Sequence, residues 1–139
     1  MNVDDTPPNV TLVRAAIDAY NRRDVQALCG LMTEDVQLRP PVFALTGRAY
    51  LGHEGIPEWL RDVEESFASA WIEPVELQDV GDGVLALTRF HVEGNESRVT
   101  LGSELGLVCD VVGGRIATWQ GFFNHAEAVR LAATLLARE

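Results

Sequence analysis

The sequence lacks a hydrophobic run long enough to cross a membrane. A membrane-spanning helix needs about 20 consecutive apolar residues, and no stretch of this chain approaches that length. The first eight residues are acidic and have neither a basic start nor a hydrophobic core, so they are not typical of a secretory signal. We therefore expect a cytoplasmic protein that does not bind membranes.

Basic residues are also scarce. The chain has 11 basic residues against 21 acidic ones, which gives a formal net charge of −10. The basic residues are scattered, and Arg22 and Arg23 form the only adjacent pair. An acidic protein repels the phosphates of nucleic acids and anionic lipids, so nucleic acid is not an expected partner.

Residues that bind metals are few and widely spaced. The chain has two cysteines, three histidines and no CxxC pattern, so the common zinc spacings are absent. Residues that are distant in sequence can still meet in space, which leaves an assembled site open at this point. We expect neither metal nor cofactor, and we interpret Cys29 and Cys109 as reduced core residues, since free cysteine is usually buried.

Apolar residues, in contrast, are abundant. They make up 47% of the 139 residues, which is enough for one hydrophobic core in a chain of single-domain length. No repeat, linker or low-complexity segment divides the chain. We predict a disordered tail over residues 1–8 and a single domain over residues 9–139.

The hydrophobic pattern changes along the chain. Apolar residues recur at helical spacing in four segments, and we predict helices over 9–22, just after the N-cap Asp24, over 53–69, and from Asn124 onward. Strand-like segments separated by glycine-rich turns are predicted at 36–40, 71–80, 84–93, 98–112 and 115–123, with a loop over 43–52. Segregated helices and strands favour an α+β fold. The glycines at 102 and 106 permit a bend or bulge that would curl the sheet around the helices.

Four short runs carry a resemblance to a known family. They are YNRRD at 20–24, YLGHEGIPEWL at 50–60, DVGDGV at 79–84, and GGRI at 113–116 followed by FFNHAEA at 122–128. In this order they resemble the SnoaL-like proteins of the nuclear transport factor 2-like, or ketosteroid isomerase-like, superfamily. The resemblance covers residues 10–136.

The resemblance implies a cone-shaped α+β fold. A curved, mostly antiparallel sheet would wrap around N-terminal helices, with a C-terminal helix and a pocket between sheet and helices. Such proteins are usually homodimers, here expected to form through the sheet. They include ketosteroid isomerases, polyketide cyclases, epoxide hydrolases and pure binding proteins, so the fold alone does not decide the function.

Two of these activities need residues that the sequence does not supply. A ketosteroid isomerase needs a carboxylate base and an oxyanion-binding pair. The resemblance puts the isomerase tyrosine at Ala16 and the base at Pro40, with the second acid near Glu104 or Gly106. It puts an acid of the epoxide hydrolases at Gly121. We therefore predict neither activity.

Two candidate catalytic residues remain. Strand alternation puts Glu104 on the same side as Gly106, and a carboxylate facing an apolar cavity would have a raised pKa suited to acid or base catalysis. The alternative leaves Glu104 in solvent, with Leu105 and Leu107 facing the core. Tyr20 lies on the apolar face of the first helix, as a hydrogen-bond donor to the cavity or as an ordinary core tyrosine.

The lining of the pocket is predicted to be aromatic. Trp119 and Phe123 share the face of the last strand that corresponds to the cavity side in the isomerases. Arg89 and His91 alternate onto the opposite face, unless the register is reversed. The predicted lining residues are Trp59, Thr88, Phe90, Trp119 and Phe123.

These observations lead to one hypothesis with alternatives. The chain is a pocket protein for a mostly hydrophobic small molecule. It acts either as an isomerase, cyclase or hydrolase by cofactor-free acid–base chemistry, or as a binding protein without chemistry. A third possibility is a dimerisation module whose own side chains fill the cavity.

Overall fold

The computed structural model describes residues 6–41, 49–93 and 100–137. They form four helices and one six-stranded sheet. The helices are α1 (Pro8–Asn21), α2 (Val25–Leu31), α3 (Gly52–Ser66) and α4 (His125–Ala137). The strands are β1 (Met32–Arg39), β2 (Tyr50–Leu51), β3 (Ser69–Asp79), β4 (Gly83–Glu93), β5 (Thr100–Val112) and β6 (Arg115–Phe122).

The sheet is mixed, with strand order β2-β1-β6-β5-β4-β3. Strands β3 to β6 pair antiparallel in succession, as the sequence predicted. Strand β1 adds parallel to β6, and β2 pairs antiparallel with β1. The turns at Gly81 and at Gly113–Gly114 use positive φ angles that glycine adopts at little cost. The predicted turn at 94–96 lies outside the described residues.

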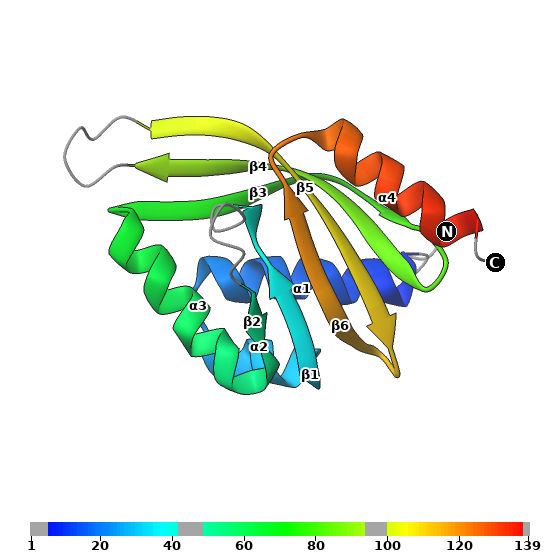
Figure 1. The fold of residues 1–139 in the computed structure, drawn as a ribbon, viewed down its shortest axis with the longest axis horizontal. Helices are drawn as coiled ribbons and strands as arrows, with labels where there is room; N and C mark the ends of the chain where they lie inside the picture. The colour runs from blue at the N-terminus through cyan, green and yellow to red at the C-terminus, as the bar shows by residue number, and fades with distance from the viewer. Residues whose placement is uncertain (1–5, 42–48, 94–99, 138–139) are drawn as a thin grey trace.

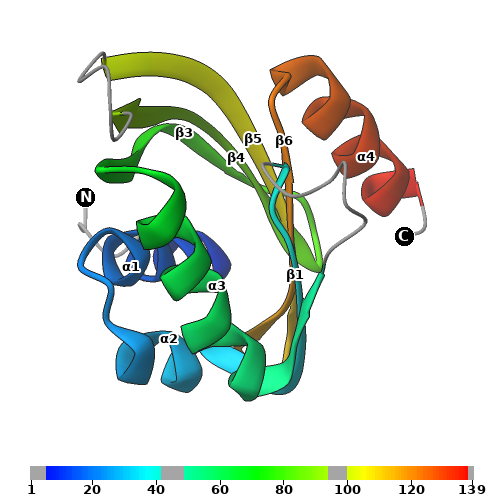
Figure 2. The ribbon, with the colours of Figure 1, turned by 60° about the vertical axis from the view of Figure 1, so that its left-hand side comes forward.

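The sheet is curved and separates two unequal layers of helix (Figures 1 and 2). Helices α1, α2 and α3 pack against its concave face, and α4 packs against the opposite face. The α+β class, the curved sheet around N-terminal helices and the C-terminal helix are therefore confirmed. Among the described residues, no helix has the length and apolar character that a membrane span requires.

Helix α1 buries one face because its apolar residues recur at helical spacing. Val13, Ile17 and Tyr20 are at most 2% exposed and belong to the main core, which fills the concave side of the sheet. The helix ends at Asn21, and α2 begins after Asp24. The Asp24 carboxylate accepts a hydrogen bond from the Ala27 N–H at 3.0 Å, so the predicted N-cap is confirmed.

Some element boundaries differ from the sequence prediction. Helix α3 ends at Ser66, three residues early, because the chain becomes extended at Phe67. Strand β1 begins at Met32 rather than at residue 36. Strand β2 lies inside the predicted loop. It has two residues and pairs with β1, and so short a segment has no hydrophobic period for a sequence reading to detect.

Helix α4 covers part of the convex face through a second, smaller apolar cluster. This cluster contains Val80, Leu85, Val108, Ala128 and Ala132. A Cβ added to Gly106 would lie 2.4 Å from the Ala128 Cβ. The pairing of β4 with β5 keeps one register from end to end, so Gly106 makes no bulge between these strands. Its missing side chain instead lets α4 approach the sheet.

Candidate functional site

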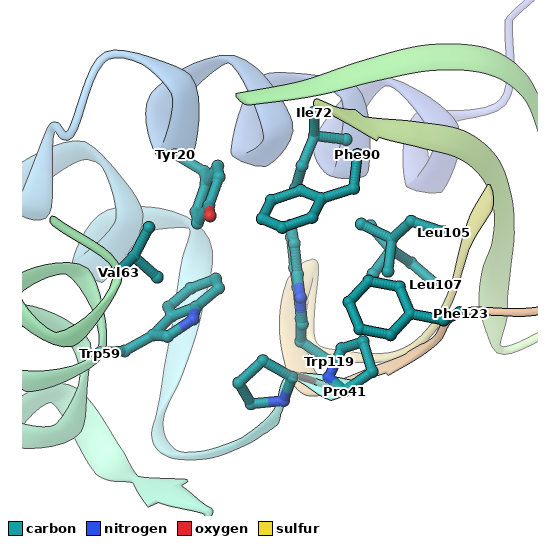
Figure 3. Close-up of a pocket in the computed structure, with 11 residues that line it drawn as sticks. Tyr20, Pro41, Trp59, Val63, Ile72, Phe90, Leu105, Leu107, Trp119 and Phe123 are labelled. Atoms are coloured by element: carbon teal, nitrogen blue, oxygen red, sulfur yellow. The ribbon is translucent and has the colours of Figure 1, made fainter. Parts of the chain in front are cut away.

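Three aromatic side chains from three separate elements meet between the concave face and the helices (Figure 3). Tyr20 comes from the last turn of α1, Trp59 from the middle of α3, and Trp119 from β6. Each is at most 2% exposed. The sequence brings them together because each lies on the apolar face of its own element.

The three rings form a compact cluster. The Tyr20 ring centroid lies 5.0 Å from that of Trp59 and 6.5 Å from that of Trp119. The two indoles are 5.5 Å apart and meet edge to face at 65°. These are favourable separations for aromatic pairs, so the cluster forms one rigid wall of a pocket.

The rest of the wall is apolar. Phe123 lies at the rim, 46% exposed, with its ring centroid 6.2 Å from that of Phe90. A Cβ on Gly121 would lie 2.6 Å from Pro41, so a side chain at this position would need Pro41 to move. The complete lining is Tyr20, Pro40, Pro41, Trp59, Val63, Ile72, Phe90, Leu105, Leu107, Trp119 and Phe123.

The pocket is narrow. The side chains surround about 350 Å³ of space when the open mouth is counted, but the cavity itself has a volume of about 20 Å³. The smaller figure is the better measure of free room, and it accommodates about one water molecule. A larger molecule therefore has to displace lining side chains. Phe123, at the rim, is the most exposed of the lining residues.

Two roomier hollows lie at the surface. One, of about 350 Å³, is lined partly by the exposed residues Gln37, Arg39 and Thr134 beside α4. The other, of about 470 Å³, includes Arg23 and Glu64. Both have mixed polar walls open to water, whereas ligand sites are usually concave and mostly apolar. We therefore regard the aromatic pocket as the candidate site.

Tyr20 is the one ionisable side chain among the described lining residues. Burial raises its pKa to about 12, and the charge of nearby Arg23 opposes this to a smaller extent. Tyr20 is thus a neutral phenol at physiological pH. Its hydroxyl makes no hydrogen bond within the described part of the chain, and Figure 3 shows the oxygen directed into the pocket.

Arg23 packs against the ring of Tyr20. Its guanidinium carbon lies 4.8 Å from the centre of the Tyr20 ring. The same group donates hydrogen bonds to the carbonyl oxygens of Tyr20 (2.7 Å) and Ala70 (2.6 Å). Arg23 has a positive φ of 56°, which is uncommon for a residue other than glycine. Its contacts join the end of α1 to β3.

Comparison with known families agrees with this geometry. A family model described as the SnoaL-like domain matches residues 13–119, from within α1 to within β6. The chain belongs to the SnoaL-like family. Among curated proteins, none matches it.

Solved structures share the fold at low sequence identity. An NTF2-like protein of unknown function from Burkholderia pseudomallei has a TM-score of 0.76 and 23% identity, covering 91% of this chain and 98% of its own. TerC, co-crystallised with polyporic acid, has a TM-score of 0.75 and 22% identity, covering 91% and 99%. An LEH-like epoxide hydrolase from M. tuberculosis has a TM-score of 0.68 and 15% identity, covering 94% and 92%. These identities show a common fold and nothing more.

Glu104 lies on the opposite side of the sheet from the pocket of this SnoaL-like domain. Leu105 and Leu107 line the pocket, and the alternation of β5 sends Glu104 to the convex face. Its side chain is 52% exposed, and its Oε1 accepts a hydrogen bond from the His125 N–H at 3.0 Å. Glu104 therefore stabilises the start of α4, and the idea of a buried catalytic carboxylate at this position was wrong.

Thr88 was a predicted lining residue, but it is not part of the lining. It is fully buried on the concave side, and its hydroxyl donates to the Leu105 carbonyl at 2.6 Å. A side chain whose only hydroxyl is bonded to the sheet has little to offer a ligand. Trp59, Phe90, Trp119 and Phe123 do lie at the pocket, and their part in binding stays a prediction.

The histidines lie away from the pocket. His91 stacks on Trp71 with ring centroids 5.0 Å apart and contacts Glu73 at 2.8 Å, on the convex face as alternation predicted. His53 bonds the Met32 carbonyl, and His125 bonds the Thr88 carbonyl. Across the described segments, no three His, Cys, Asp or Glu side chains are grouped to hold a metal ion.

The sequence reading missed part of the wall. Leu105, Leu107, Val63 and Ile72 line the pocket alongside the aromatic residues. The signal for the leucines was present, since they alternate with Glu104 on β5. Pro41 directly follows the predicted first strand, but nothing in the sequence indicates that its ring packs over Gly121.

Proposed function

We propose that this SnoaL-like protein binds a small, mostly apolar molecule between Trp59 and Trp119. The observation that carries the proposal is the wall itself, in which aromatic and aliphatic side chains surround a single buried phenol. Apolar walls with a few placed polar groups are typical of ligand sites. TerC, which shares the fold, was co-crystallised with a small molecule.

Binding without acid–base chemistry is the form of this function that we favour. Glu104 points away from the pocket, and Tyr20 has a pKa of about 12. A general acid or base works best with a pKa near the working pH, so Tyr20 suits hydrogen bonding better than proton transfer. The same proposal includes a cytoplasmic homodimer formed through the part of the convex face that α4 leaves uncovered.

The small cavity favours a second candidate. A volume of about 20 Å³ is also what a core filled by its own side chains would leave. In that case the protein would be a dimerisation module without a ligand. Native mass spectrometry of the purified protein separates the two, since a co-purified small molecule supports binding, whereas a ligand-free dimer supports the module.

A titration with tryptophan variants tests the binding site. Of the chain's three tryptophans, two line the pocket, and Trp71 lies on the convex face, 38% exposed. We expect 1-indanone, a small bicyclic ketone, to bind the wild type. Trp59→Phe and Trp119→Phe should weaken binding about fivefold or more, while the matched control Trp71→Phe leaves it unchanged. Equal affinity in all three folded variants would count against the pocket.

A further inference from the structure

Strand β3 lies at one edge of the described sheet, because it pairs with β4 on one side only. The outer side of an edge strand presents backbone N–H and C=O groups that no neighbouring strand satisfies. In an antiparallel ladder, every second residue directs these groups away from its partner strand. Ile72 is such a residue, since both of its backbone groups bond to a side chain of α1.

Asn21, the last residue of α1, takes the place of a neighbouring strand at Ile72. Its Oδ1 accepts a hydrogen bond from the Ile72 N–H at 2.8 Å, and its Nδ2 donates to the Ile72 carbonyl oxygen, also at 2.8 Å. A primary amide carries both an acceptor and donors on one planar group. One side chain therefore satisfies both backbone groups of Ile72, and both bonds are partly buried.

Arg23 fastens the edge of β3 two residues before Ile72. Its Nη2 donates to the Ala70 carbonyl oxygen at 2.6 Å, and its Nη1 donates to the Tyr20 carbonyl oxygen at 2.7 Å. The φ of 56° at Arg23 is a conformation that a residue other than glycine keeps only when its surroundings maintain it. We call Asn21 and Arg23, with their bonds to Ile72 and Ala70, the clasp.

The clasp joins two walls of the aromatic pocket. Tyr20 directly precedes Asn21 in α1, and both Tyr20 and Ile72 line the pocket (Figure 3). Because the free space is only about 20 Å³, the separation of these two walls limits the size of the molecule that the pocket can hold. Val13 and Ile17 are buried in the main core, so the body of α1 remains packed on the sheet even without the clasp.

We propose that the clasp sets the width of the pocket and so selects ligands by size. Asn21 and Arg23 are not among the described lining residues, so they are positioning residues that act through Ile72 and Tyr20. The inference rests on the proposed binding function.

Hydrogen exchange followed by NMR tests the clasp itself. The Ile72 amide should exchange about tenfold faster in Asn21→Ala than in the wild type, because the hydrogen bond that protects it is lost. The matched control is Arg22→Gln, which removes two surface ion pairs, to Asp18 and Asp24, at the same end of α1. It should leave the exchange of the Ile72 amide unchanged. Equal exchange rates in the wild type and Asn21→Ala would overturn the inference.

Two probes of different width test the effect of the clasp on binding. Calorimetry measures the affinities of 1-indanone and of 9-fluorenone, which has one more fused benzene ring. Asn21→Ala and Arg23→Gly should raise the affinity for 9-fluorenone relative to 1-indanone about 3- to 10-fold, whereas Arg22→Gln keeps the wild-type ratio. Arg23→Gly is a second clasp variant that retains the turn, because glycine adopts a positive φ at little cost. Comparing each probe with itself across variants cancels the difference in hydration between the probes.

A loss of stability alone would not change this ratio, because both affinities are measured on the folded protein. If 1-indanone binds and the ratio is the same in the wild type and the folded clasp variants, the inference is overturned while the pocket remains a binding site. An equal change of the ratio in Arg22→Gln would also overturn it. If neither probe binds the folded wild type, the proposed function fails, and the inference fails with it.

Discussion

Replacing each tyrosine by phenylalanine, one at a time, distinguishes a bonded buried hydroxyl from an unbonded one. Tyr20 and Tyr50 are the only tyrosines of the chain, and both are 2% exposed. The Tyr50 hydroxyl donates to the Asp62 carboxylate at 2.6 Å, whereas the Tyr20 hydroxyl bonds to no described residue. The two substitutions remove the same atom from equally buried rings.

The expected changes in stability differ in size. Tyr50→Phe removes a hydrogen bond to a carboxylate, which should lower the free energy of unfolding by about 1.5–3 kcal/mol. In a domain of this size, that loss lowers Tm by about 4–10 °C. Tyr20→Phe removes a hydroxyl that the protein does not satisfy, so the free energy of unfolding should change by less than about 1 kcal/mol, in either direction.

Thermal unfolding followed by circular dichroism measures both variants. Far-ultraviolet spectra at low temperature show whether each variant has the wild-type secondary structure. The reasoning is refuted if Tyr20→Phe loses as much stability as Tyr50→Phe. In that case the Tyr20 hydroxyl has a partner within the protein.

Three further predictions concern other parts of the account. Burial raises the Tyr20 pKa from 10.0 to about 12, so the contribution of Tyr20 to the free energy of unfolding is complete below pH 10 and is lost as pH rises towards 12. Denaturant titrations at increasing pH should show a steeper loss of the free energy of unfolding in the wild type than in Tyr20→Phe. Gly106→Ala drives a Cβ towards Ala128 and should lower the free energy of unfolding by about 1–3 kcal/mol. Its control Gly30→Ala, in α2 with nothing within 4 Å of the added Cβ, should raise the free energy of unfolding by about 0.5–1 kcal/mol. Equal effects of the two substitutions in urea unfolding would contradict the close packing of α4. Phe123→Ala opens the rim and should speed 1-indanone association in stopped-flow fluorescence, and an unchanged rate would show that the molecule enters elsewhere.

Much of the fold follows from the hydrophobic period of the sequence. The spacing of Val13, Ile17 and Tyr20 gave α1 its buried face. The alternation that runs from Trp119 in β6 to Phe123, one residue past the end of the strand, gave the concave side. Both patterns work because one face of the element is buried and the other is not.

The side on which Glu104 lies was harder to predict, for a physical reason. In β5 the concave side carries Leu105 and Leu107, while Gly106 and Val108 on the convex side are buried beneath α4. A strand that is covered on both faces has no clear alternation, so the residues of β5 alone left two alternatives. Contact with α4, whose residue His125 lies 21 residues beyond Glu104 in the chain, decides between them.

The environment of Tyr20 was only partly predictable. Its place on the apolar face of α1 indicated that it was buried, but the missing hydrogen bond depends on every side chain around it. The left-handed backbone of Arg23 also has no sequence signal, because such a conformation is expected for glycine. These features arise from tertiary packing, which a local pattern does not record.

A crystal structure of the protein grown with 1-indanone tests the central claim most directly. The account predicts that the ketone lies between Trp59 and Trp119, with Phe123 displaced from the rim. A pocket filled only by its own side chains, with the ketone absent or bound at another surface, would contradict it.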